Sequence, residues 1–158
     1  MKGAPHAPAP AANAPDAAGA PHFCRQRMVR FSDCDPAGIV FYPQYFVMFN
    51  GLVEDWVTDG LGVDFHDLIA VQRIGLPTVR LEVDFRAVSR MGDAVQLALR
   101  VERVGGSSIT LHAHCMGVDG VERLRMRQVL VCTSLETHRA IAIPPALKAA
   151  LGRLPLHA

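Results

Sequence analysis

Two aspartates, Asp33 and Asp35, lie in a short segment with proline and glycine, just before a strongly apolar stretch begins. Proline and glycine impose a turn, and the apolar stretch has helical spacing, so the turn leads into a helix N-terminus. A carboxylate held there is able to attack an electrophilic carbon or to take a proton from water. The backbone N–H of Tyr42 or a neighbour is able to donate to negative charge developing on a carbonyl oxygen.

The same aspartates also have a purely structural interpretation. Asp side chains accept hydrogen bonds from nearby backbone N–H groups and are therefore common in turns. Read from the turn alone, Asp33 and Asp35 remain open to both interpretations. Pro36 and Gly38 force a specific path on the chain, which favours a role for the turn beyond a simple connection.

A long helix is expected from Pro43 to about Asp59, because apolar residues recur there around much of the helical circumference. That breadth predicts a helix buried on most sides. Asn50, Glu54 and Thr58 share one face at four-residue spacing. They form either a solvated or interface-facing edge, or the polar lining of a substrate pocket, for which Asn50 is the better placed.

Most of the remaining chain has the two-residue period of strands. We expect a first strand at residues 23–31, a short helix within 63–73, strands at 78–88, 94–104, 108–118 and 124–135, and a final helix at 146–151. The pair Asp119-Gly120 predicts a two-residue hairpin. Short connections favour antiparallel neighbours, so the fold class is α+β, with a curved five-stranded antiparallel sheet around the long helix.

The chain has 158 residues, enough for one domain with a hydrophobic core. Residues 1–21 are rich in alanine and proline, so we expect a disordered tail there and a single domain over residues 22–158. A formal net charge of +1 gives no long-range attraction to nucleic acid or an anionic membrane.

Neither export nor membrane insertion is expected from the sequence. Prolines within the first 15 residues interrupt the apolar run that a secretory signal needs. No run of about 18 apolar residues is present to span a membrane. The four cysteines form no CxxC pair, which is typical of reduced thiols in a cytoplasmic protein.

Two groups of residues outside the turn are candidates for other contacts. Arg86, Arg90 and the turn containing Ser107 and Ser108 carry donors suited to phosphate, although solvated strand faces explain scattered arginines equally well. His112 and His114 share a strand face, but Cys115 points to the opposite face. We therefore expect no metal site there.

The run DCDPAGIVFYPQYF, followed by Glu54 and Trp56, closely resembles the 4-hydroxybenzoyl-CoA thioesterase family of hotdog-fold proteins. The resemblance covers roughly residues 23–143. It implies a hotdog fold and hydrolysis of an acyl-CoA thioester to the free acid and CoA, without a metal or organic cofactor. It further implies that Asp35 is catalytic, that the Tyr42 N–H polarises the thioester carbonyl, and that Asp33 supports the turn.

The resemblance also implies a homodimer whose sheets join edge to edge, with each site built from two chains. Such dimers often pair again into a homotetramer, and the residues do not choose between dimer and tetramer. The residues predicted to contact substrate are Gly38, Asn50, Glu54, Arg86, Arg90, Ser107 and Ser108. Asn50 stands where the 4-hydroxybenzoyl-CoA enzyme has a carboxylate, and residues 105–108 stand where that enzyme has a basic cluster. The acyl group therefore stays open, with aromatic groups among the candidates.

Two alternatives belong to other functional classes. The first is a non-catalytic hotdog domain that binds acyl-CoA without turnover. The second is a hotdog hydratase or dehydratase, but that chemistry needs a histidine beside the carboxylate, and the turn and long helix contain none. Asp35 acts either as a nucleophile or as a general base towards water, and the residues do not choose between the two.

Overall fold

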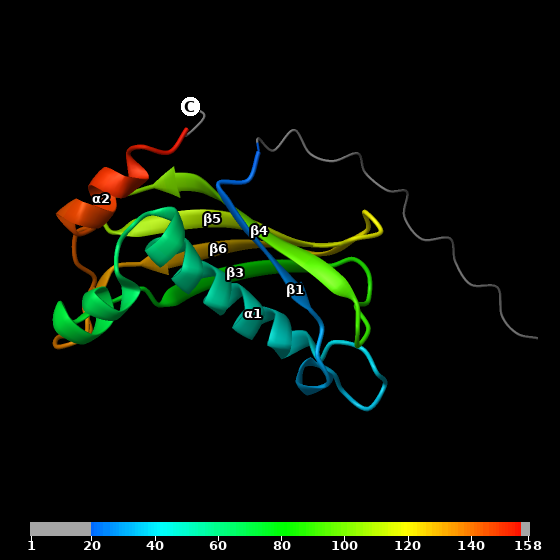
Figure 1. Cartoon of the computed structure of the whole chain (residues 1–158). Helices are drawn as coiled ribbons and strands as arrows, with labels where there is room; N and C mark the ends of the chain where they lie inside the picture. The colour runs from blue at the N-terminus through cyan, green and yellow to red at the C-terminus, as the bar shows by residue number, and fades with distance from the viewer. Residues whose placement is uncertain (1–19, 156–158) are drawn as a thin grey trace, which may run out of the picture.

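In the computed structural model, which describes residues 20–155, a five-stranded antiparallel sheet carries one long helix on one of its faces (Figure 1). The strand order is β1-β4-β5-β6-β3. The strands are β1 (Phe23–Met28), β3 (Thr78–Phe85), β4 (Ala94–Val104), β5 (Ser108–Gly117) and β6 (Glu122–Val131). The predicted α+β architecture is therefore confirmed, whereas the predicted tail lies almost entirely outside the described residues.

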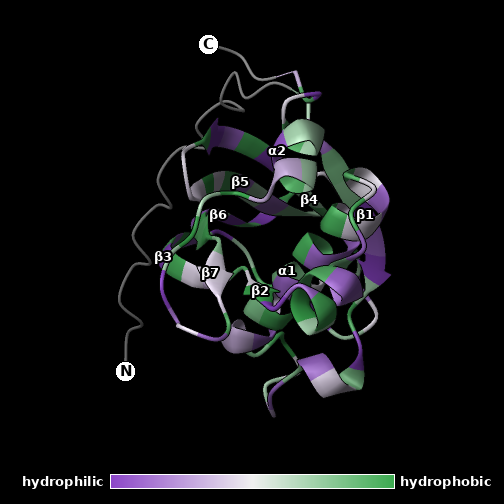
Figure 2. Ribbon diagram, turned by 90° about the vertical axis from the view of Figure 1, so that its left-hand side faces the viewer, coloured by the Kyte–Doolittle hydropathy of each residue, from purple (hydrophilic) through white to green (hydrophobic). Residues whose placement is uncertain are grey.

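Helix α1 (Tyr42–Asp55) continues into a wider π-helical turn, Trp56–Gly60, and lies on the concave side of the curved sheet (Figure 2). Its buried side chains face the sheet and include Phe49 and Trp56, each 1% exposed. The opposite stripe is open to solvent in the single chain and includes Val47, Asn50 and Glu54. The expectation of a helix buried on most sides was wrong for the single chain, because the sheet covers only one side of it.

Smaller elements close the ends of the sheet. A two-stranded sheet pairs β2 (Ile74–Gly75) with β7 (Thr133–Ser134), after a helical turn at Asp67–Val71. The C-terminal helix α2 (Pro145–Leu151) buries Leu147 and Leu151 against the core. None of the helices in residues 20–155 is both long and apolar enough to cross a membrane.

Strand β4 matches its predicted bounds, whereas β1 ends at Met28, before a 3-10 turn at Phe31–Asp33, β5 ends at Gly117 and β6 begins at Glu122. Two further differences from the predictions have local reasons. Strand β3 ends at Phe85, because the N–H groups of both Arg86 and Ala87 donate to the carbonyl of Arg123, at 2.9 and 3.2 Å. The predicted strand at 124–135 is interrupted at Cys132, where the chain leaves the main sheet to form β7.

The hairpin between β5 and β6 has a three-residue loop, not the predicted two-residue one. The N–H of Gly120 donates to the carbonyl of Gly117 at 3.0 Å, and the N–H of Gly117 donates to the carbonyl of Val121 at 2.9 Å. Gly120 has φ +77°, the left-handed conformation that follows a type I turn in such loops. The register shift between Cys115 and Met116 absorbs the extra residue.

The two edge strands differ in character. On β1, Arg25 forms ion pairs with Asp55 and Asp59 of the helical segment, so charged side chains tie this strand to α1. On β3, one face carries the exposed charges of Arg80 and Glu82, and the other face carries Val79 and Leu81, exposed by 60% and 39%. Exposed apolar side chains on a strand edge invite pairing with another strand, whereas charges discourage it.

Candidate active site

Asp35 lies in a tight turn that fixes its backbone and one of its two carboxylate oxygens. Its N–H donates to the carbonyl of Ile39 at 3.0 Å, and its carbonyl accepts from the N–H of Gly38 at 2.9 Å. The Oδ1 atom accepts from the N–H of Ala37 at 2.8 Å. Gly38 has φ +75°, which side-chain-bearing residues rarely adopt. Within the described residues, Oδ2 has no hydrogen-bond partner.

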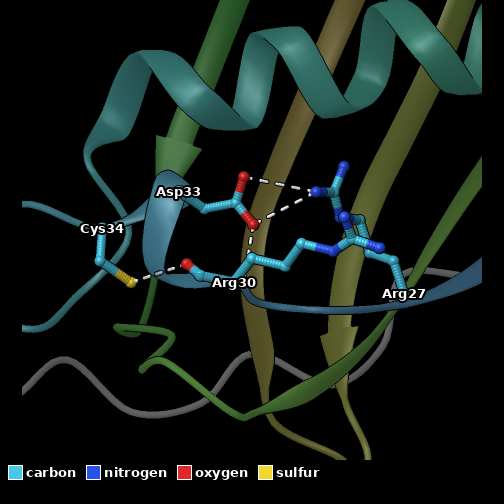
Figure 3. Close-up of polar contacts among 4 residues, drawn as sticks. All are labelled: Arg27, Arg30, Asp33 and Cys34. Carbon is cyan, nitrogen blue, oxygen red and sulfur yellow. Dashed lines mark hydrogen bonds and ion pairs between the residues drawn. The ribbon is translucent and has the colours of Figure 1, made fainter.

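Asp33 has a different environment and is almost fully buried, with 6% exposure. Its carboxylate accepts from a guanidinium nitrogen of Arg27 at 3.2 and 3.3 Å and from the N–H of Arg30 at 2.8 Å (Figure 3). Its carbonyl accepts from the N–H of Phe41 at 2.9 Å. These contacts leave Asp33 directed into the protein, so its geometry is that of a residue which holds the turn.

The turn folds back so that the start of α1 lies beside it. Cys34 and Val40 form an antiparallel bridge, which returns the chain towards Asp33 before the helix begins. Tyr42 is the first helical residue, and its N–H is among the donors that a helix leaves unpaired. Pro43 has no N–H to compete with it. Asp35 and the Tyr42 N–H therefore lie on the two arms of one small hairpin.

Cys34 also lies in this hairpin, with its thiol donating to the carbonyl of Arg30 at 3.4 Å (Figure 3). Desolvation, together with the negative charges of Asp33 and Asp35, raises the pKa of the Cys34 thiol above its ordinary value. A thiol with a raised pKa stays protonated at neutral pH and is a poor nucleophile. The partly exposed carboxylate of Asp35 is therefore a better candidate for a reactive group in the hairpin than this thiol.

The segment between β3 and β4 borders the hairpin and brings Arg90 to it. Ile39 and Arg90 form an antiparallel bridge, and the N–H of Val40 donates to the carbonyl of Ser89 at 2.9 Å. Arg86 is turned to its own strand neighbours, with its guanidinium 3.6 Å from Asp84 and 3.4 Å from Glu122. Of the two predicted phosphate contacts, Arg90 is the one the fold places at the hairpin.

Aromatic rings cover the surface at the start of α1. The ring of Tyr42 packs edge-to-face against those of Phe41, Phe46 and Phe85, with centroids 5.5, 6.3 and 6.1 Å apart. Phe85 comes from β3, and both it and the Tyr42 side chain are more than half exposed. Sequence reasoning missed Phe85, because it lies within the strand predicted at 78–88 and nothing in the sequence sets it apart.

The remaining predicted residues lie at different distances from Asp35. Asn50 is exposed on α1, two turns beyond Tyr42. Glu54 lines a separate pocket of about 330 Å³ between β1 and α1, together with Arg25, Arg27 and Leu97. The lining of that pocket includes neither Asp35 nor Asn50.

Ser107 and Ser108 lie at the opposite end of the sheet from the hairpin. Strand β4 has 11 residues and starts at Ala94, beside the hairpin. At about 3.3 Å per residue, such a strand separates its two ends by more than about 30 Å. One chain alone therefore does not bring these serines to Asp35.

The two strand histidines belong to the sheet face that points away from α1. The Nε2 atom of His112 lies 2.9 Å from Glu102, which also receives two hydrogen bonds from Arg127. Burial lowers the pKa of His114 below its ordinary value. Within residues 20–155, no three His, Cys, Asp or Glu side chains are grouped as metal ligands would be.

Comparison with known proteins places these features in a family. Residues 29–151 match the family model of the thioesterase-like superfamily. The 1,4-dihydroxy-2-naphthoyl-CoA hydrolase of Synechocystis is 26% identical over 129 residues, which covers 82% of this chain and 88% of that protein. The corresponding enzyme of Prochlorococcus marinus strain MIT 9313 is 30% identical over 96 residues, 55% of this chain and 62% of that protein.

Solved structures agree on the fold. The Synechocystis 1,4-dihydroxy-2-naphthoyl-CoA thioesterase superposes with a TM-score of 0.76 at 22% identity, over 84% of this chain and 96% of that one. A gentisyl-coenzyme A thioesterase superposes with a TM-score of 0.73 at 26% identity, over 81% and 98%. The chain belongs to the thioesterase-like superfamily, and the predicted hotdog fold and acyl-CoA thioesterase activity are confirmed at the level of that family.

Proposed function

We propose that this protein hydrolyses a hydroxylated aromatic acyl-CoA, with Asp35 as the reacting carboxylate and the Tyr42 N–H as the oxyanion donor. The observation that carries this proposal is the hairpin that presents both groups. One carboxylate oxygen is held by the N–H of Ala37, and no hydrogen bond within the described residues engages the other. That arrangement suits attack at a carbonyl carbon whose oxygen faces the helix N-terminus.

Two routes fit this geometry. In the first, Oδ2 of Asp35 attacks the thioester carbon, the oxyanion accepts a hydrogen bond from the Tyr42 N–H, and collapse breaks the C–S bond to release CoA thiolate. Water then hydrolyses the acyl-aspartyl anhydride. In the second, Oδ2 takes a proton from a water molecule as that water attacks the same carbon. Both routes use the same two groups.

The surface beside the hairpin supports an aromatic acyl group. The edge-to-face rings of Phe41, Tyr42, Phe46 and Phe85 offer the contacts that aromatic substrates prefer. Asn50 adds a neutral donor and acceptor on the same helix, suited to a hydroxyl group. Two of the similar proteins are named for 1,4-dihydroxy-2-naphthoyl-CoA and gentisyl-CoA, which are hydroxylated aromatic thioesters.

A second copy of the chain completes the site in this proposal. Strand β3 carries exposed Val79, Leu81 and Phe85 at the edge of the sheet, next to the aromatic rings. Antiparallel pairing of two β3 strands about a two-fold axis places the far end of one sheet beside the hairpin of the other. Ser107 and Ser108 of one chain then approach Asp35 of its partner, so that both ends contribute to CoA binding. Further pairing of two such dimers gives the homotetramer.

A substrate panel tests the proposal. Thiol release is measured from 1,4-dihydroxy-2-naphthoyl-CoA, gentisyl-CoA, benzoyl-CoA and palmitoyl-CoA, with wild type and Asn50→Leu. We expect the hydroxylated aromatic thioesters to have the highest kcat/KM. Because Asn50 meets the hydroxyl, Asn50→Leu lowers their kcat/KM about tenfold and leaves that of benzoyl-CoA within about twofold. Preference for palmitoyl-CoA would contradict the acyl assignment, and tight binding without turnover would favour the non-catalytic alternative.

A further inference from the structure

Ser89 is hydrogen-bonded both to the returning arm of the hairpin and to the first turn of α1. Its carbonyl accepts from the N–H of Val40 at 2.9 Å, and its hydroxyl accepts from the phenol of Tyr45 at 2.8 Å. Val40 belongs to the returning arm of the hairpin, and Tyr45 to the first turn of α1. Ser89 is 1% and Tyr45 4% exposed, so water does not compete for these hydrogen bonds.

The proposed reacting groups, Asp35 and the Tyr42 N–H, lie close to the two residues that Ser89 binds. The residue before Val40 is Ile39, whose carbonyl accepts from the N–H of Asp35 at 3.0 Å. Tyr45 follows Tyr42 by three positions, so the two residues lie about one helical turn apart. A shift of Ser89 would therefore move the carboxylate-bearing arm and the N–H-bearing arm relative to each other.

The segment that carries Ser89 is hydrogen-bonded to the sheet on one side and to the hairpin on the other. On one side, the N–H groups of Arg86 and Ala87 donate to the Arg123 carbonyl of β6. On the other side, Arg90 bridges to Ile39, and the N–H of Met91 donates to the carbonyl of Gly38 at 3.4 Å. The anchor thus relates the hairpin and the helix to the rigid part of the fold.

The phenol of Tyr45 has the properties of a fixed donor. Burial raises the pKa of Tyr45 above its ordinary value, while the hydrogen bond to Ser89 and the charge of Arg123 act in the opposite direction. The phenol therefore stays protonated across neutral pH and donates to Ser89 throughout. Its hydroxyl is committed to that bond, not to substrate.

We propose that Tyr45 and Ser89 are positioning residues for thioester hydrolysis, which hold the Asp35 carboxylate and the Tyr42 N–H at the separation that the reaction needs. This inference rests on the proposed function, in that it takes Asp35 and Tyr42 as the reacting groups. A displacement of about 1 Å at a reacting group costs up to about 100-fold in rate. Loss of one anchoring hydrogen bond leaves the packing in place, so we expect it to lower the rate by a smaller factor.

The test compares Tyr45→Phe, Ser89→Ala and the double variant with wild type. The matched control is Thr133→Val, which also removes one hydroxyl hydrogen bond, the 3.2 Å contact to the carbonyl of Val131 at the far end of the sheet. We expect kcat to fall about tenfold in each single variant while KM stays within about twofold. The double variant should lose no more than the worse single variant, because both remove the same bond.

A second measurement does not depend on activity. Amide hydrogen exchange of residues 38–46 should be faster in Tyr45→Phe than in wild type, and unchanged in Thr133→Val. Unchanged exchange, unchanged kcat, an equal kcat loss in Thr133→Val, or a shifted pH–rate profile in Tyr45→Phe would each overturn the positioning role. If wild type hydrolyses no acyl-CoA, the proposed function fails, and the exchange measurement alone decides whether Ser89 anchors the hairpin.

Discussion

The guanidinium of Arg27 and the carboxylate of Asp33 lie 3.2 Å apart and join strand β1 to the hairpin that carries Asp35. The side chain of Asp33 is 8% exposed, whereas that of Arg27 is 33% exposed. A carboxylate buried to this extent is costly without its partners. The pair therefore ties the position of Asp35 to the sheet.

The first prediction concerns this ion pair. Asp33→Ala should lower the free energy of unfolding by about 3 kcal/mol, because it leaves Arg27 unpaired and frees the N–H of Arg30. Arg80→Met is the control, since it breaks the exposed pair with Glu82 and should change stability by less than about 1 kcal/mol. Urea unfolding followed by circular dichroism measures both. Equal effects of the two substitutions would show that Asp33 does not hold the hairpin.

The second prediction tests whether the Asp35 carboxylate takes part in the reaction or only stabilises the turn. Asp35→Asn keeps an oxygen able to accept from the Ala37 N–H but removes the charge, so kcat should fall about 10²- to 10⁴-fold with the fold intact. Asp64→Asn is matched to it, because Asp64 likewise accepts a backbone N–H in an exposed turn, from Asp67 at 2.9 Å. Thiol-release kinetics of both variants give the comparison. Full activity in a folded Asp35→Asn variant would exclude the proposed mechanism.

Most of the fold could be predicted from local pattern. The boundaries of β4 match residues 94–104 as expected, because turn residues flank it on both sides. The end of β3 could not be predicted, since it depends on two N–H groups sharing the carbonyl of Arg123, which is distant in sequence. The loop at Gly120 was wrong by one residue because the same dipeptide suits two hairpin types.

The arrangement of the candidate site could be predicted only where its residues are contiguous in sequence. Asp35, Gly38 and Tyr42 lie within one hairpin, so the motif and its geometry coincide. Ser89 and Phe85 reach the site through sheet topology, and nothing in their own sequence neighbourhood marks them. Ser107 and Ser108 stay a prediction, since their relation to Asp35 depends on a second chain.

The third prediction concerns how the free energy of unfolding falls at acidic pH. The hydrogen bond from Arg127 is the largest cause that lowers the pKa of Glu102, and the neighbouring charges of His112, Arg127 and Arg100 add to it. A carboxyl whose pKa is lower in the folded state stabilises the fold above its unfolded value of 4.5, and this contribution is lost as the pH falls through the folded value.

Glu102→Gln should therefore flatten the fall of stability below about pH 4.5, relative to wild type. Unfolding free energies from urea titrations between about pH 3 and pH 7 measure this effect. Asp84→Asn serves as the control, because Asp84 is on the same sheet face but mainly exposed, and its ion pair with Arg86 is long, at 3.6 Å. Parallel pH profiles for wild type and Glu102→Gln would contradict the assignment.

The fourth prediction concerns the edge of the sheet. Leu81→Lys places a charge in the middle of the apolar β3 edge, where it opposes pairing with a second β3 strand. If the site needs both chains, this substitution should convert the assembly to single chains and lower kcat/KM, with the core unchanged. Gln26→Lys provides the matched charge on the other edge strand, β1, and should leave the assembly intact. Sedimentation and thiol-release assays of the same samples test both statements, and an assembled Leu81→Lys protein with full activity would place the interface elsewhere.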